Sequence, residues 1–263
     1  AGGNSNTFNV DGRGYTTAAA AGITDGNVAI TGASVNTEAG FSVVTYTGST
    51  ASGALTVGHG LGKKPAWVII KRRDASSDWI IGHKGLQTTS GGFANNKFLK
   101  FDTSAMFTNS LVWGVEPTTT VTQIVTDGNA GATNLTSSGT YVMYSWAEIP
   151  GYSKFGSYVG NGDNDGTFVD LGFKPAFVII KRLASESWIF ADIKRTTNEL
   201  QPIDYYLLST SNAAQSTGII YDFLSNGIKF RSNSQNENGA TYIYLAWAEE
   251  PSGTGFGLDA NCR

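Results

Sequence analysis

The chain has 263 residues, a formal net charge of −3 and only 15% charged residues, against about 25% in an average globular domain. Gly, Ser, Thr and Asn make up 105 of the residues, and aromatic residues reach 12%. This composition argues against a helical bundle, a disordered chain and an electrostatic nucleic-acid binder, and it favours a turn-rich, strand-rich soluble protein.

Residues 1–40 have no counterpart elsewhere in the chain, so we expect them to form an N-terminal attachment or linker segment. Their only helix-like stretch is Tyr15–Gly22, with Thr as a candidate N-cap and Gly as a stop. The chain begins with Ala1 and shows no signal segment, so either Met was removed or the chain is part of a longer protein. No apolar run is long enough to cross a bilayer, and we expect no membrane insertion.

An internal repeat is the strongest signal in the sequence. Lys64–Arg72 recurs as Lys174–Arg182 with eight of nine residues identical, and three further block pairs follow the same order. These pairs are Tyr46–Gly48 with Tyr158–Gly160, Ser77–Ile81 with Glu186–Phe190, and Thr140–Pro150 with Thr241–Pro251. The offset drifts from block to block, which indicates a duplicated domain with loops of unequal length. The predicted domains are residues 41–150 and residues 151–263, the second with a C-terminal tail.

Each repeat is expected to consist of short strands. Ala66–Ile70 and Ala176–Ile180 are β-branched runs after a proline, and Tyr141–Trp146 and Tyr242–Trp247 are apolar enough for central strands covered on both faces. Turn signals separate the strands at Ser90–Gly92, Thr126–Asn129, Asn161–Gly162, Asp165–Gly166 and Ser225–Gly227. The pattern predicts an all-β chain of two tandem homologous antiparallel β-sandwich domains.

The histidines and the single cysteine give little support for a catalytic or zinc site. His59 and His83 have no cysteine cluster beside them, and we expect both on surface loops. The glycine-rich Gly58–Lys64 has the wrong spacing for a phosphate-binding loop and leads into Pro65, so it is expected to be a turn. Cys262 alone excludes an intrachain disulfide.

Three carboxylates form the weak candidate for a metal site. Asp163 and Asp165, with Asp170 downstream, resemble the start of a calcium loop, but the bidentate Glu of that pattern is missing. A plain β-turn is the favoured interpretation, calcium remains the alternative, and no metal or other cofactor is predicted.

Charges recur at matching places in the two repeats. Lys71–Arg72 and Lys181–Arg182 end one strand, and Glu148 and Glu249 end another. We expect a cross-strand ion pair between them in each domain. Acid–base catalysis by either glutamate would need a second carboxylate nearby, and none recurs, so no catalytic residue is predicted.

Six tryptophans could provide a surface on which sugars stack. Five of them occupy repeat motifs and are expected in the core or half-buried: Trp67, Trp79, Trp146, Trp188 and Trp247. Trp113 lies outside the motifs, so it is the weak candidate for an exposed ligand-binding residue.

The second repeat carries motifs that resemble a known family. Gly172–Arg182, Ser187–Phe190, Phe223–Phe230 and Thr241–Pro251 resemble a repeat domain of tailed-bacteriophage virion proteins, especially tail-fibre-like proteins of marine phages. The resemblance covers nearly the whole chain and implies a virion-surface β domain, often built into trimeric fibres or knobs, with a role in host attachment. It carries over no catalytic or binding residue. Leu111–Thr122 in the first repeat departs from the pattern.

Taken together, these patterns predict a non-enzymatic structural protein on the external surface of a virion: a tail fibre, a tip, or a capsid-attached fibre or decoration. Its expected partners are other virion proteins, further copies of itself, with a homotrimer favoured, and a host-surface glycan. Two alternatives are a lectin-like carbohydrate-binding module and a polysaccharide depolymerase, the latter requiring paired acidic groups in a cleft.

Overall fold

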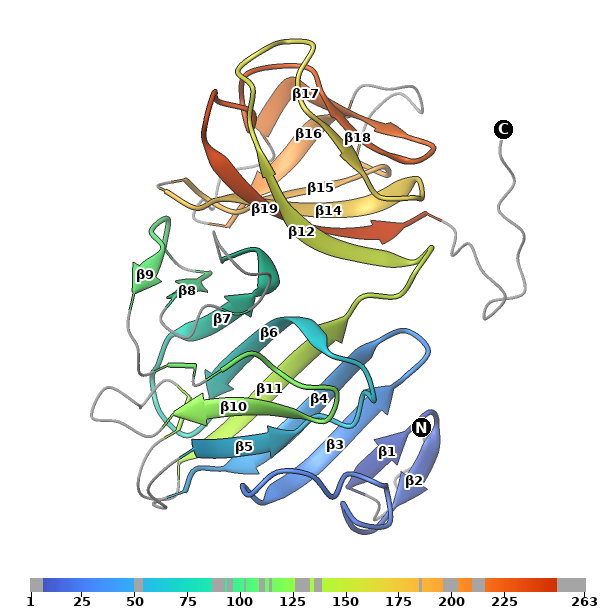
Figure 1. Ribbon diagram of the computed structural model, residues 1–263, viewed down its shortest axis with the longest axis vertical. Helices are drawn as coiled ribbons and strands as arrows, with labels where there is room; N and C mark the ends of the chain where they lie inside the picture. Colours follow the sequence, from blue (N-terminus) through green and yellow to red (C-terminus); the bar gives the residue numbers. More distant parts are fainter. Residues whose placement is uncertain are drawn as a thin grey trace. The chain divides into compact units, whose positions relative to one another are not determined.

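The chain is an all-β protein in the computed structural model, which describes residues 7–49, 54–86, 93, 97–101, 103–108, 112–113, 115–125, 133–134, 139–184, 186–195, 203–209 and 216–249 (Figure 1). The strands of the first part are β1 (Phe8–Val10), β2 (Arg13–Tyr15), β3 (Ile30–Asn36), β4 (Phe41–Thr47), β5 (Ala54–Gly58), β6 (Pro65–Arg72), β7 (Trp79–His83), β8 (Lys97–Lys100), β9 (Phe107–Thr108), β10 (Val121–Val125) and β11 (Thr140–Ala147). The remaining strands are β12 (Ser153–Val159), β13 (Phe168–Asp170), β14 (Pro175–Arg182), β15 (Ile189–Asp192), β16 (Ile203–Leu208), β17 (Ser216–Leu224), β18 (Gly227–Phe230) and β19 (Thr241–Ala248). The all-β prediction is confirmed.

The helical content of the described ranges is a single 3₁₀ turn, η1 (Lys84–Leu86). Within those ranges no helix has the length and apolar character needed to span a membrane. The predicted turns at Ser90–Gly92 and Thr126–Asn129, Cys262 and the C-terminal tail lie outside the described residues.

The chain divides into two compact units. Unit 1 is Ala1–Lys100 with Phe107–Ala147, and unit 2 is Phe101–Met106 with Glu148–Arg263. Unit 1 holds a nine-stranded sheet in the order β2-β1-β3-β4-β11-β6-β7-β8-β9 and a separate β10–β5 pair. Unit 2 holds an eight-stranded sheet in the order β12-β19-β14-β15-β16-β17-β18-β13.

The segment before residue 41 is built into unit 1. Its strands β1, β2 and β3 extend the nine-stranded sheet, and Phe8, Ile23 and Val35 join the core of that unit. β1 runs parallel to β3, whereas the other described strand pairs are antiparallel. The sheet is therefore mixed at this edge rather than purely antiparallel as predicted.

In the helix-like stretch Tyr15–Gly22, Tyr15 is the last residue of β2 and the other residues form bends and turns instead of a helix. The cap and the stop act as predicted, because the Thr17 hydroxyl oxygen accepts from the Ala20 N–H at 3.1 Å and Gly22 has a φ of 75°. They enclose only one turn, however, which ends where Ile23 enters the core. A single turn is too short to propagate a helix.

The two units share one pairing scheme around their central strands. The order β4-β11-β6-β7-β8 in unit 1 corresponds to β12-β19-β14-β15-β16 in unit 2, and the β10–β5 pair corresponds to β18–β13. β11 and β19 are therefore central, as predicted. β19 is buried at five consecutive positions, so both its faces are covered, whereas β11 is fully buried only at alternate positions.

A β-bulge recurs at the same proline in both units. Ala147 lies opposite Pro65 although Trp146 lies opposite Trp67, so Ala66 has no partner residue on β11. β14 skips a residue in the same way after Pro175 against β19. Proline has no N–H to donate to the ladder, which explains why the register shifts at this point.

Each unit has its own hydrophobic core. In unit 1 the β10–β5 pair lies over the nine-stranded sheet (Figure 1). The core cluster of this unit includes Val68 and Ile70 from the sheet and Leu55 and Ile124 from the pair. In unit 2 the core gathers side chains from β14 and β19 on one side and from β17 and β18 on the other. Several of the described loops carry exposed residues, among them 24–27, 62–64 and 161–165, and functional sites often form on such loops.

Candidate functional site

In each unit, a tyrosine hydroxyl forms a hydrogen bond to the loop before the last strand. The Tyr46 hydroxyl donates to the Thr133 carbonyl at 2.5 Å, and the Tyr158 hydroxyl donates to the Gln235 carbonyl at 2.7 Å. Burial raises the pKa of both tyrosines above the ordinary value, so both stay protonated donors over the physiological range.

The residue after each of these carbonyls is a fully buried asparagine. The Asn134 side-chain oxygen accepts from the Ser49 N–H at 2.8 Å, and the Asn236 side-chain oxygen accepts from the Asn161 N–H at 3.2 Å. Each asparagine thus connects the loop before the last strand of its unit, β11 or β19, to the loop that follows β4 or β12. The sequence motifs missed this pair, although Asn134 and Asn236 are 102 residues apart, close to the offset of the neighbouring strand blocks.

Asn236 has its polar atoms fully used. Besides its bond to the Asn161 N–H, its oxygen accepts from the Thr167 N–H at 3.3 Å. Its NH₂ group donates to the Asn161 side-chain oxygen at 2.7 Å and to the Asp163 carbonyl at 2.9 Å. A buried group with every polar atom paired specifies one loop conformation, here that of residues 160–167.

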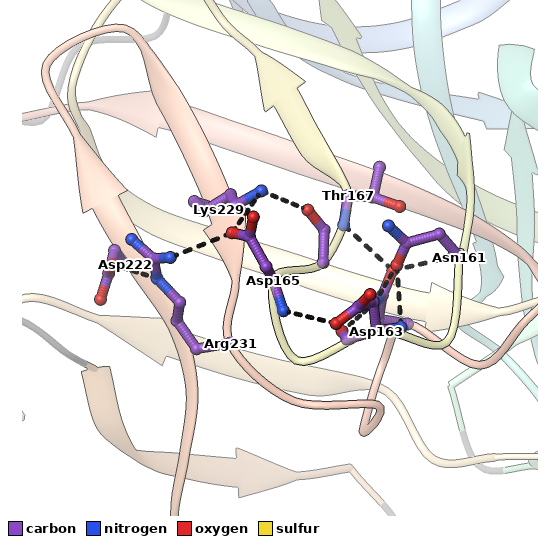
Figure 2. Close-up of polar contacts among 9 residues, drawn as sticks. Asn161, Asp163, Asp165, Thr167, Asp222, Lys229 and Arg231 are labelled. Carbon is purple, nitrogen blue, oxygen red and sulfur yellow. Dashed lines mark hydrogen bonds and ion pairs between the residues drawn. The ribbon is translucent and has the colours of Figure 1, made fainter.

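Two of the candidate calcium ligands, Asp163 and Asp165, lie on this loop and have different partners (Figure 2), and the third, Asp170, is the last residue of β13. One Asp163 carboxylate oxygen accepts from the Asp165 N–H at 3.0 Å, as in an Asx turn. Asp165 instead pairs with Lys229 at 3.0 Å and Arg231 at 3.4 Å, and these cations hold its pKa below the ordinary value. Asp170 pairs with a different cation, Lys154, at 3.6 Å. No group of three or more His, Cys, Asp or Glu side chains suited to a metal occurs in the described ranges.

We expect millimolar Ca²⁺ to leave the melting temperature of the protein unchanged. A cation at Asp165 would have to displace both Lys229 and Arg231 from the carboxylate. Differential scanning calorimetry with added Ca²⁺ and with a chelator checks this. A rise in melting temperature with Ca²⁺ that is abolished by Asp163→Asn would contradict it.

The predicted ion pairs between the Lys–Arg dipeptides and the glutamates do not form. The paired strands are antiparallel, so Arg72 at the end of β6 lies opposite Tyr141 near the start of β11, far along the strand from Glu148. The Glu148 carboxylate instead accepts from the Phe155 N–H at 2.9 Å. The prediction was wrong because the charged residues lie at the C-terminal ends of two antiparallel strands, and these ends are at opposite edges of the strand pair.

Each member of the predicted pairs has another partner. The bidentate Arg72 contact holds the pKa of Asp74 well below its ordinary value. Arg182 pairs with Glu186 at 2.9 Å, and Lys181 is buried. The remaining glutamate, Glu249, pairs with Lys174 at 2.6 Å.

Trp113 is not the exposed aromatic residue that the sequence predicted. Its side chain is only 1% exposed, and Phe93 meets it edge to face with ring centroids 5.7 Å apart. Gly82 beneath them has no room for a Cβ, which would lie 2.2 Å from the Phe93 ring. Phe93 and Trp113 belong to the unit 1 core, contributed by segments that carry no repeat motif.

Trp79, a motif tryptophan, is the exposed one, with 38% of its surface accessible. Its ring lies 6.4 Å from that of Tyr144, and the Lys71 ammonium is 5.7 Å from its centroid. Its counterpart in the repeat, Trp188, is fully buried. Equivalent motif positions therefore differ in exposure between the units.

We expect acrylamide to quench the fluorescence of Trp79 much more than that of Trp113, because only the first has an accessible ring. Stern–Volmer measurements on Trp79→Phe and Trp113→Phe variants check this. The accessible fraction should fall in Trp79→Phe and should not fall in Trp113→Phe. The reverse order would contradict the burial of Trp113.

Both histidines are fully buried, contrary to the prediction that they lie on surface loops. His59 Nδ1 accepts from the Leu61 N–H at 3.2 Å, and its Nε2 lies 3.3 Å from the Thr118 carbonyl, to which it donates as the neutral tautomer. Burial lowers the pKa of His59 to about 4. In the same way, His83 Nδ1 accepts from the Gly85 N–H at 2.9 Å.

A surface cavity of about 160 Å³ lies beside His59 in unit 1. It is lined by residues from three loops: Gly22, Ile23, Asp25, Gly60, Gly62, Thr119 and Thr120. The glycine-rich stretch after β5 is thus a loop, as predicted, and β6 begins at Pro65 as a strand. This cavity is a candidate for a binding site in the described part of the chain.

Residues 4–251 match the protein family described as "Domain of unknown function (DUF7483)". Comparisons with curated proteins and with solved structures gave no match. The matched region includes the strands β1 to β19, so the family domain comprises both units. The chain therefore belongs to the DUF7483 family.

Proposed function

We propose that this chain is a structural protein of the exterior of a tailed-phage virion, as a tail fibre, a tip, or a capsid-attached fibre or decoration, and that it takes part in host attachment. The observation that supports this best is that the two units have the same order of central strands. The low fraction of charged residues agrees with it. Such a β framework holds loops in place, and loops on a rigid scaffold commonly carry binding functions.

We further propose that the two units are homologous β-sandwich domains that arose by duplication. The equal order of the central strands, the bulge at Pro65 and at Pro175, and the tyrosine bonds to Thr133 and Gln235 all support this. Unrelated domains would have no reason to repeat a bulge and a loop fastening at matching positions.

Gold-labelled antibody against the chain, applied to intact phage particles, tests the proposed location. We expect label on an external structure of the virion. Label that appears only in lysates of infected cells, and never on intact particles, would overturn the proposal.

The partners we propose are other virion proteins and two further copies of this chain in a homotrimer. Analytical ultracentrifugation of the purified chain should give three times the 27.8 kDa chain mass. A mass equal to one chain at micromolar concentration would contradict the trimer, because fibre and knob subunits associate tightly.

The second candidate function, a lectin-like module, is favoured by the cavity beside His59 and describes how attachment would work. No observation on the described residues favours the third, a polysaccharide depolymerase, and we do not propose it.

A further inference from the structure

We propose that the cavity lined by Gly22, Asp25, Gly60, Gly62 and Thr119 binds one neutral hexose ring of a host-surface glycan. This inference rests on the proposed role in attachment and adds the site and the class of ligand. We refer to this cavity as the glycine cavity.

The size of the glycine cavity limits its ligand. Its volume of about 160 Å³ equals that of about five waters and lies below the range typical of nucleotide or drug-sized pockets. A single sugar ring is in this size class, whereas a nucleotide, a flavin or a peptide segment is not. The cavity therefore suits the end or one ring of a glycan.

Several polar groups around the cavity have no partner in the described part of the chain. These are the exposed Asp25 carboxylate, the Thr119 hydroxyl, and the backbone N–H groups of Gly60 and Gly62. Together they offer acceptors on one residue, donors on two others, and a hydroxyl that can do either. Beside them the Ile23 side chain, 7% exposed, supplies an apolar surface.

This set of groups matches a polyhydroxylated neutral molecule best. Sugar hydroxyls can donate to Asp25 and accept from the Gly60 and Gly62 N–H groups, while the C–H face of the ring packs on Ile23. A phosphate or sulfate would be repelled by the carboxylate, and an ammonium group would leave both amide donors unpaired. A Ca²⁺ ion would find only one carboxylate.

The walls of the cavity are held in place before any ligand arrives. The segment after Asp25 is bonded to β5, because the N–H groups of Asn27 and Val28 both donate to the Thr56 carbonyl. His59 fixes the opposite wall through its backbone N–H, which donates to the Thr120 carbonyl at 3.1 Å. A site that needs little ordering on binding loses less affinity to conformational entropy.

Gly60 and Gly62 both have a backbone conformation that favours glycine. Their φ values are 72° and 65°, in the left-handed region. A Cβ on Gly60 would lie 3.0 Å from Ile23, whereas one on Gly62 would meet nothing within 4 Å. Position 62 can therefore carry an asparagine, which tolerates this φ and would occupy open space at the cavity.

The experiment is a titration of the ¹⁵N-labelled full chain with D-glucose, D-galactose, D-mannose and N-acetyl-D-glucosamine, one at a time, followed by amide shifts in NMR. We expect at least one sugar at millimolar concentration to shift the amide signals of Gly60 and Gly62. Asp25→Asn and Gly62→Asn should each weaken that binding by about tenfold or more. Variants that retain the wild-type spectrum elsewhere are folded and can be compared.

Two controls make the result specific to the glycine cavity. Gly172→Asn is the matched variant, because Gly172 has a φ of 77° and open space around its Cβ but does not line the cavity. Trp79→Ala removes the exposed aromatic ring on which a sugar could stack instead. Both should bind as wild type does. If no sugar shifts Gly60 or Gly62, if Asp25→Asn and Gly62→Asn bind normally, or if only Trp79→Ala loses binding, the inference is wrong.

The sugar titration and the antibody labelling of virions can fail separately. External label without sugar binding would overturn the glycine cavity and leave the virion role standing. Sugar binding at Gly60 and Gly62 without external label would overturn the virion role and leave the cavity as a glycan site.

Discussion

Replacing Asn236 with alanine is expected to lower the free energy of unfolding of unit 2 by about 3 kcal/mol. The fully buried side chain makes four hydrogen bonds, and its loss leaves the N–H groups of Asn161 and Thr167 and the Asp163 carbonyl without their partner. Part-buried polar groups left unpaired are the main source of this destabilisation.

The matched control for Asn236→Ala is Asn164→Ala. Asn164 is on the loop of residues 160–167 that Asn236 holds, but it is exposed, and no hydrogen bond within the described ranges involves its side chain. Urea unfolding gives the stability change, and hydrogen exchange resolved by peptide assigns it to unit 2. An Asn236→Ala effect as small as that of Asn164→Ala, within about 0.5 kcal/mol, would show that the asparagine does not hold the loop.

His59 is expected to make the stability of unit 1 fall as the pH drops from about 6.5 to about 4. The folded protein holds the imidazole neutral with a pKa of about 4, whereas the unfolded chain takes up a proton near pH 6.5. Over this window only the unfolded state binds the extra proton, so the free energy of unfolding falls by about 1.4 kcal/mol per pH unit, or about 3 kcal/mol in all. Above pH 6.5 this contribution is fully present.

His59→Gln tests this pH dependence because glutamine can still donate to the Thr118 carbonyl but does not titrate. Between pH 6.5 and 4, the free energy of unfolding of the variant should fall less steeply with decreasing pH than that of wild type. The difference in slope should correspond to the uptake of about one proton. The slopes are compared rather than the absolute stabilities, since the substitution itself removes the acceptor for the Leu61 N–H. Equal slopes in both proteins would contradict a buried neutral His59. The carboxylate of Asp74 acts in a separate, more acid window, because its pKa is lowered below the ordinary Asp value.

The repeat predicted the strands that the two units share. Strands β6 and β14 lie within the repeated blocks Lys64–Arg72 and Lys174–Arg182. The central strands β11 and β19 correspond to the blocks that contain Tyr141 and Tyr242. Long β-branched runs after a proline depend mainly on local preference and burial, both of which a sequence displays. The strands that the two units share could therefore be predicted from the sequence alone.

The candidate site was much less accessible from the sequence. The glycine cavity brings together loops around Asp25, Gly60 and Thr119, which are far apart in the chain and carry no motif. The burial of His59 and Trp113 likewise depends on segments that fold over them from elsewhere, Thr118–Thr120 and Phe93. Long-range packing of this kind leaves no repeating signal in the sequence, whereas the blocks that recur in the two halves of the chain do.

A competition measurement of phage adsorption tests whether the chain is displayed on a virion for host attachment. Host cells are preincubated with the purified, folded chain, and the rate at which phage particles adsorb is measured against its concentration, with heat-unfolded chain as the control. We expect the adsorption rate to fall as the folded chain occupies the receptor and to stay constant with the unfolded chain. An adsorption rate that does not change at any concentration of the folded chain would contradict it.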